Sequence, residues 1–83
     1  MAKTILVLQR GWVAIGDLWE NESGVKLDNA SIIRRWGTTK GLGQLALEGP
    51  TAETQLDPCG SVEARHEAVV FRLPCKEGSW PLS

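Results

Sequence analysis

Long apolar runs and a charge excess of either sign are missing from this sequence. The N-terminal apolar run covers only residues 5–8, which is too short for the core of a signal peptide or for a membrane span. The 9 Lys and Arg residues against 10 Asp and Glu residues give a net charge of -1, so no general basic field attracts nucleic acid. We therefore expect a cytoplasmic protein without membrane contact, and only a local basic patch remains open.

Metal-binding and nucleophilic side chains are also scarce. Cys59, Cys75 and His66 are the only cysteines and histidine. The two cysteines could pair, but a cytosolic chain keeps its thiols reduced, which favours free thiols over a bridge. These three residues lack a C-x-x-C pair and a fourth ligand of suitable spacing for zinc. A nucleophilic thiol would need His66 within reach. We expect no metal, no cofactor and no catalytic residues, hence a protein that is not an enzyme.

The chain is too short for a large core. Its 83 residues predict one domain, residues 1–74, followed by a tail at 75–83. A domain of this size buries only roughly 60–65% of its unfolded surface, and homo-oligomerisation is the usual supplement. Four tryptophans, one phenylalanine and no tyrosine indicate that some indoles are exposed or face a partner.

The first half of the chain predicts a β-meander. The run 4–8 is apolar on both alternating faces, as in a strand covered on both sides. A second strand at 12–19 contains Gly16, which marks a bend or a close backbone approach. The third strand, 25–36, changes its apolar phase at residues 29–30 and predicts a β-bulge there. The isoleucines favour this strand over a helix across the same segment.

A short helix follows the meander. The turn 37–41 offers Thr38 or Thr39 as an N-cap for a helix that begins near Lys40 or Leu42. Gly49 and Pro50 end the helix, and its apolar stripe is Leu42, Leu45 and Ala46.

The last third of the chain predicts loops and strands. Residues 51–60 are expected to form a polar linker that ends in a turn at 57–60. Strands follow at 61–64 and 66–73, where Val69, Phe71 and Leu73 should face the core and His66 the solvent. The predicted fold class is mainly β: a bent antiparallel sheet or small, partly open barrel of about five strands, with one short helix after the third strand.

The corner between the third strand and the helix carries the most specific pattern. Its basic side chains, threonine hydroxyls and helix-start N–H groups can hold an anion, while Trp36 stacks a base or sugar. In the alternative, Trp36 anchors the strand end and the arginines are solvated or pair with Glu20 or Glu22. The predicted ligand-binding residues are Arg34, Arg35, Trp36, Thr38, Thr39, Lys40, Gly41 and Gly43.

Two other sequence features say less about function. Residues 41–46 match G-x-G-x-x-A formally, but the dinucleotide fingerprint needs a βαβ unit that this chain is too short to complete. Trp12 and Trp19 lie on opposite faces of one strand, so we expect one of them at an interface or binding surface. Trp80 is expected to clasp the domain or a neighbouring subunit. The predicted interface residues are therefore Trp12, Trp19 and Trp80.

Four segments together resemble a known group of proteins. They are Gln-Arg-Gly-Trp at 9–12, Ile-Arg-Arg-Trp-Gly-Thr-Thr-Lys-Gly-Leu-Gly at 33–43, Gly-Pro-Thr at 49–51 and Leu-Asp-Pro-Cys-Gly at 56–60. The chain resembles a family of small uncharacterised proteins of tailed bacteriophages and prophages, with no assigned activity. The resemblance implies an accessory protein of a mobile element. Separately, the layout of residues 12–30 is similar to that of Sm-like and SH3-like barrels, and fold alone does not give function.

Together these features favour a non-enzymatic accessory binding protein that self-associates in the cytoplasm of an infected or lysogenic bacterium. Its partner is expected to be a host protein or a phosphorylated small molecule, bound by the Arg34–Gly43 corner. The alternative is a small nucleic-acid-binding barrel that places Arg10, Arg34, Arg35 and Lys40 on phosphates.

Overall fold

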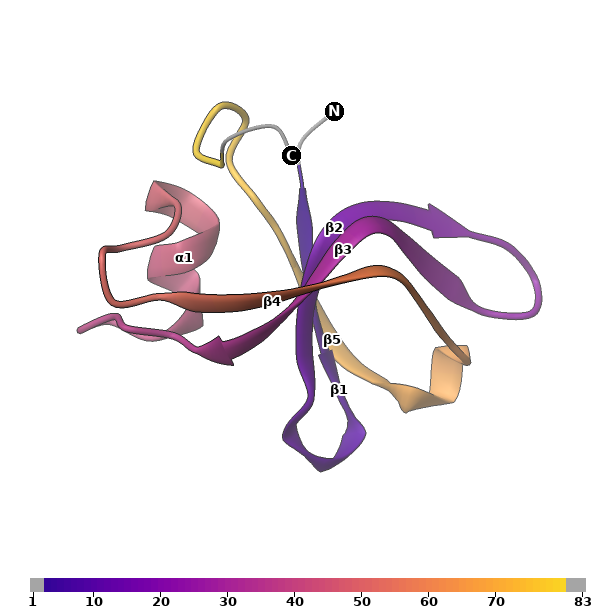
Figure 1. The fold of residues 1–83 in the computed structure, drawn as a ribbon. Helices are drawn as coiled ribbons and strands as arrows, with labels where there is room; N and C mark the ends of the chain where they lie inside the picture. The colour runs from indigo at the N-terminus through magenta and orange to yellow at the C-terminus, as the bar shows by residue number, and fades with distance from the viewer. Residues whose placement is uncertain (1–2, 81–83) are drawn as a thin grey trace.

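The computed structural model describes residues 3–80 and shows one open, five-stranded antiparallel sheet with strand order β4-β3-β2-β1-β5 (Figure 1). One helix, α1, follows the third strand, and this confirms the predicted fold class. Two short 3-10 helices, η1 and η2, precede β2 and β5. The element bounds are β1 Thr4–Leu8, η1 Gln9–Gly11, β2 Val13–Glu20, β3 Val25–Arg35, α1 Leu42–Glu48, β4 Gln55–Ala64, η2 His66–Ala68 and β5 Val69–Pro74.

The sheet curls because β2 and β3 are both irregular at the same level. The register of β2 against β3 shifts around Gly16, and a Cβ atom there would lie only 2.8 Å from the carbonyl oxygen of Asp28. Asn29 adopts a positive φ of 50°, and the β3–β4 register shifts beside it. Bulges bend and twist a strand pair. Both irregularities, the close approach at Gly16 and the bulge at 29–30, are those the sequence predicts.

Each face of the curled sheet has its own buried cluster. Ile5 and Leu6, neighbours in β1, are both fully buried and point into different clusters, which confirms the strand covered on both sides. The inner cluster, enclosed by the curl, is Leu6, Ala14, Val25, Leu27 and Ala30. The outer cluster, covered by the helix, is Ile5, Val13, Ile15, Ile33, Leu42, Leu45, Ala46 and Cys75.

Helix α1 is held in place by the segment that follows β5. The Lys76 amide donates to the carbonyl of Ala46 at 2.7 Å, and the Trp80 indole N–H donates to that of Leu45 at 2.8 Å. The Lys76 bond gives a partner to the Ala46 carbonyl, near the C-terminal end of the helix where intrahelical partners run out, while the Leu45 carbonyl also accepts from the Gly49 amide at 3.0 Å. Residues 75–80 of the predicted tail therefore pack against the domain, whereas residues 81–83 lie outside the described residues.

Residues 51–54 form a linker as predicted, but the linker and turn predicted at 55–60 are wrong, because residues 55–64 form the continuous strand β4. Pro58 is compatible with an edge strand, where one N–H is not needed by a neighbour. Gly60 provides a positive φ of 80° beside a register shift. The same residue types that favour turns thus make a bulged edge strand here.

The face assignments in the last strand are also partly wrong. His66 is exposed to solvent, as predicted, but it lies in η2 and not in a strand, and Phe71 is 50% exposed instead of facing the core. Strand β5 carries a register shift against β1 between the partners of Val7 and Leu8. Val69 consequently packs on the inner cluster and Leu73 on the outer one. Because of that shift, core-facing and solvent-facing residues do not alternate regularly along β5.

Among residues 3–80, no helix is long and apolar enough to cross a membrane.

Candidate binding surface

The loop of residues 36–41, called the corner loop below, is fixed by side chains that bond its backbone. The hydroxyl of Thr54 donates to the carbonyl of Trp36, and that of Thr51 donates to the carbonyl of Gly37, each at 2.7 Å. Gly37 has a positive φ of 66°, and a Cβ atom there would lie 2.5 Å from the carbonyl carbon of Glu53. The loop therefore lies directly against the chain that leads into β4.

A second brace comes from the helix side. Gln44 Oε1 accepts from the amides of Lys40 and Thr39 at 3.0 and 3.3 Å and lies 3.4 Å from the hydroxyl of Thr39. Gln44 is the third residue after the N-cap, Gly41, the position whose side chain reaches back in a capping box. Its carbonyl oxygen thereby occupies two of the backbone donors that precede the helix.

The predicted threonine N-cap is wrong. The N-cap is Gly41, no side chain caps it, and the hydroxyl of Thr38 instead donates to the carbonyl of Gly41 at 3.1 Å. Helix α1 has only seven residues, and the amides of Thr39 and Lys40 are bonded to Gln44. The amides of Thr39 and Lys40 are therefore not free to hold an anion, and the basic side chains of the corner are the charged groups that can contact one.

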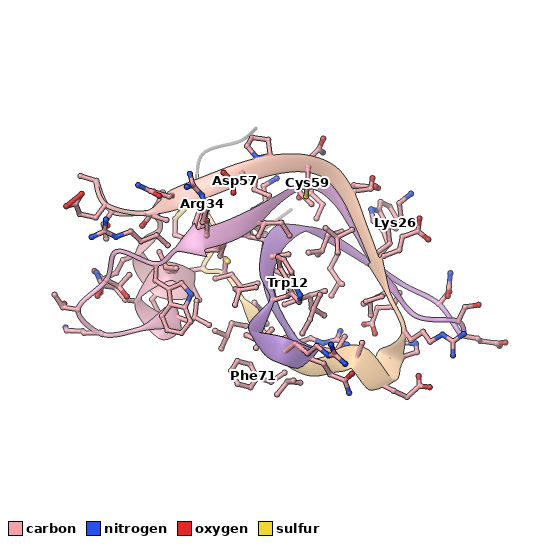
Figure 2. All side chains as sticks on the ribbon, turned by 60° about the horizontal axis from the view of Figure 1, so that its bottom comes forward. Trp12, Lys26, Arg34, Asp57, Cys59 and Phe71 are labelled. Atoms are coloured by element: carbon pink, nitrogen blue, oxygen red, sulfur yellow. The ribbon has the colours of Figure 1, made fainter. Side chains whose placement is uncertain are left out.

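The basic side chains of the corner differ in what they contact. Arg34 Nε lies 3.0 Å from Asp57 Oδ2, across the β3–β4 pair (Figure 2). The sequence offered Glu20 or Glu22 as the acidic partner, and the structure supplies Asp57 instead. Arg35 and Lys40 are exposed, and no described residue forms an ion pair with either.

Trp36 shares the corner with these two cations. Its side chain is 42% exposed, while its backbone carbonyl is bonded by Thr54. Its ring is therefore accessible on a fixed backbone. Gly41 is half-buried and Gly43 is exposed. A Cβ atom added to either glycine would have no other group within 4 Å. Of the predicted ligand-binding residues, Arg35, Trp36 and Lys40 are the ones left accessible, without an ion-pair partner, on a braced backbone.

The other tryptophans lie elsewhere. Trp12, 59% exposed, precedes β2, and Figure 2 shows it apart from Arg34. Trp19 is 56% exposed on the end of β2. Trp80 is half-buried against α1 in its own chain.

The far end of β3, where the β2–β3 hairpin turns, has a different character. The guanidinium of Arg72 donates to both carboxylate oxygens of Glu20, at 2.8 and 3.1 Å, and His66 Nε2 donates to the carbonyl of Asn21 at 2.7 Å. The bonds from Arg72 lower the pKa of Glu20 below its usual value. They tie β5 and η2 to the hairpin and so close this end of the curl.

A shallow pocket of about 340 Å³ opens beside that hairpin. Its wall combines an exposed indole with charges of both signs. One of its cations, Lys26, lies 3.4 Å from Asp28. The other charged lining residues, Arg65 and Glu63, form no ion pair among residues 3–80, so the wall carries one unpaired charge of each sign. The lining residues are Trp19, Asn21, Ser23, Gly24, Val25, Lys26, Glu63, Ala64 and Arg65.

The cysteines show no catalytic or metal-binding arrangement. Both thiols are free, Cys59 exposed on β4 and Cys75 buried. Burial raises the pKa of Cys75 to about 11, so this thiol stays protonated at neutral pH. The part of the chain that the structure describes holds no group of three or more His, Cys, Asp or Glu residues able to bind a metal ion.

Comparisons with family models, with curated proteins and with solved structures give no match for this chain. The interpretation of the surface therefore depends on its own geometry.

Residues of the corner that sequence reasoning missed are those that brace it. Gln44 has a local signal, its position three residues after the helix N-cap. Thr51 and Thr54 have none, because their partners lie 14 and 18 residues earlier in the chain.

Proposed function

We propose that this chain is a non-enzymatic binding module that holds a phosphorylated small molecule or an acidic surface of a host protein on its corner loop. The observation that carries the proposal is a combination at one corner: side chains of Thr51, Thr54 and Gln44 fix the loop backbone. Lys40 in the loop and Arg35 at the adjoining end of β3 have no ion-pair partners among residues 3–80.

Preorganisation supports this function because a loop that is already ordered loses little entropy on binding. Two exposed cations beside a partly exposed indole provide charge-assisted hydrogen bonds and a stacking surface. Arg34 contributes less, since Asp57 already compensates its charge. The phage or prophage setting, the bacterial cytoplasm and the accessory role depend on the sequence resemblance. Self-association is part of the proposal because the domain is small.

Nucleic-acid binding through Arg10, Arg34, Arg35 and Lys40 is the second candidate. Its support is the exposure of Arg10, which extends from η1 at a positive φ of 66°. The pairing of Arg34 with Asp57 and the net charge of -1 weaken it, because affinity for the phosphate backbone depends on uncompensated cations.

A thermal-shift titration with ATP, inorganic pyrophosphate and a single-stranded oligonucleotide tests the proposal. Binding to the folded state raises the melting temperature as ligand concentration rises. We expect a saturable rise with the phosphate compounds, lost in the variant Arg35→Gln/Lys40→Gln. The matched control, Arg65→Gln/Lys76→Gln, removes two exposed cations elsewhere and should keep the response.

The outcomes separate the candidates. A rise with the oligonucleotide alone, falling steeply with salt, would favour nucleic acid. No rise with any of the three probes, together with no corner-dependent capture of an acidic protein from bacterial lysate, would overturn the proposed function.

A further inference from the structure

The two outer strands of the sheet differ in how their free edges are protected. Among the described strands, β4 pairs only with β3, and β5 pairs only with β1. An unpaired edge is a template for another strand, and proteins blunt such edges with proline, bulges and charges. The edge that lacks these devices is the one at which another chain can be added.

Strand β4 is heavily blunted. Pro58 removes one backbone donor from the middle of the strand, and Gly60 has a positive φ of 80°. Three register shifts interrupt its pairing with β3. Glu63 adds an exposed negative charge to the same strand, and Asp57 adds a carboxylate that is paired with Arg34. A new strand would therefore find no continuous row of partners along β4.

Strand β5 is blunted much less than β4, because it has a single register shift against β1, near its first residues. Its only proline, Pro74, is the last residue, and β-branched and aromatic side chains, which suit sheets, fill its first half. Val70 and Phe71 are 60% and 50% exposed. The single charge, Arg72, is compensated by two hydrogen bonds to the carboxylate of Glu20. The edge is thus apolar and electrically neutral.

We propose that β5 pairs antiparallel with β5 of a second copy of this chain, about a two-fold axis close to Phe71. Such pairing joins two five-stranded sheets into one continuous sheet. It places Phe71 beside the partner's Phe71 as a cross-strand aromatic pair, an arrangement that stabilises antiparallel sheets. Phe71 is the Cα partner of Val7, which packs on the outer cluster, so the contact extends an existing apolar surface.

A second copy fits this edge because the pairing is self-complementary. A two-fold contact uses the same patch twice, and here that patch brings no uncompensated like charges together. The net charge of -1 leaves little repulsion between whole chains. A domain with so small a core also gains most from added burial. The inference deepens the self-association within the proposed function and is independent of ligand binding at the corner loop.

The first test is the mass of the full chain in solution, measured by sedimentation velocity over a wide concentration range. The wild type should show a reversible monomer–dimer equilibrium. Phe71→Lys should weaken dimerisation by about thirtyfold or more, which is the effect of removing a central interface residue. The effect is large because a two-fold contact contains each substitution twice. Leu47→Lys is the matched control: Leu47 is 63% exposed on α1, and its variant should dimerise like the wild type. Circular dichroism melting curves establish that both variants fold.

The second test concerns symmetry. In the variant Cys59→Ser/Phe71→Cys, mild oxidation should give a disulfide-linked dimer, since residue 71 faces its own copy only in a two-fold β5–β5 contact. A wild type that stays monomeric at every concentration would overturn the inference and the self-association, while anion binding at the corner loop would still be tested separately. A dimer that survives Phe71→Lys, or one that gives no cross-link at residue 71, would overturn the β5 contact and leave self-association standing.

Discussion

The two ends of β3 are braced alike but use their charges differently. At the hairpin, Asn21 Oδ1 accepts from the amides of Ser23 and Gly24, at 2.8 and 3.1 Å. At the corner loop, Gln44 Oε1 does the same for Thr39 and Lys40. In both loops a side-chain carbonyl replaces the strand partners that the turning backbone has lost.

Charge separates the two ends. The hairpin end pairs Glu20 with Arg72 and Lys26 with Asp28, and its remaining exposed cation, Arg65, lies in the pocket wall together with the acidic Glu63. The corner loop leaves Arg35 and Lys40 without ion-pair partners in the described part of the chain. Bracing alone therefore does not mark a binding surface. A braced loop beside two uncompensated cations indicates a binding surface, and this is why we place the proposed function at the corner.

The largest effects should come from the two clusters beneath these ends. Leu27 is fully buried in the inner cluster, and Leu45 is fully buried in the outer one, on the helix that follows the corner loop. Leu27→Ala and Leu45→Ala should each lower the free energy of unfolding by about 2–5 kcal/mol, as measured by urea denaturation. Under conditions where both variants remain folded, only Leu45→Ala should also weaken phosphate binding. Equal losses of affinity in the two variants would remove the distinction between the ends.

Glycine substitutions give the next effect. A Cβ atom at Gly37 would meet Glu53, and one at Gly24 would meet the carbonyl of Ala64. Overpacking of this kind costs about 1–3 kcal/mol, so Gly37→Ala and Gly24→Ala should lower the melting temperature to similar extents. Gly37→Ala should in addition reduce affinity for pyrophosphate, because it displaces the corner loop. An unchanged affinity in Gly37→Ala would mean that the loop conformation does not matter for binding.

Much of this architecture follows from local sequence, and the reasons are physical. Gly16, the phase change at Asn29 and the glycine at the end of α1 each produce their effect within a few residues, so the bend, the bulge and the helix end could be predicted. Strand β4 could not, because its proline and glycine favour turns, and only pairing with β3 makes them a bulged edge. Likewise the Arg72–Glu20 contact spans 52 residues and has no local signal.

The same division holds for the candidate surface. The basic and aromatic side chains of the corner could be read from adjacent positions such as Arg35 and Trp36. Which of these charges are paired within the fold could not be predicted, since the partner of Arg34 is Asp57 on another strand. The occupation of the loop amides by Gln44 also escaped prediction, although its position after the N-cap gave a signal.

A smaller effect is expected from the brace itself. Gln44→Ala removes the acceptor for two amides that are near solvent, and a hydrogen bond of this kind contributes about 0.5–1.5 kcal/mol. Calorimetric titration should therefore show weaker pyrophosphate binding with a modest loss of stability. Gln44→Glu keeps an acceptor but adds a negative charge, so it should keep the stability and still lose affinity. Wild-type affinity in Gln44→Glu would argue against electrostatic binding at the corner.

The smallest effect concerns the ion pair at the hairpin end. Arg72 lowers the pKa of Glu20 in the folded state, so the pair stabilises the fold above the ordinary glutamate pKa of 4.5 and loses this contribution as the pH falls through the lowered value. Arg72→Gln should flatten that part of the stability–pH profile and barely change stability at high salt. A profile that coincides with the wild type across this acidic range would show that the pair is not formed in solution.

The most direct test of the central claim, a pre-formed cationic loop that takes an anion through its side chains, is an NMR titration of the full chain with ATP. The four indole N–H signals report on different parts of the fold. We predict saturable shifts at residues 34–43 and at the Trp36 indole, with the Trp19 and Trp80 indoles unmoved and with no response in Arg35→Gln/Lys40→Gln. Shifts centred on the Trp19 pocket, or a response that persists in the double variant, would contradict the account.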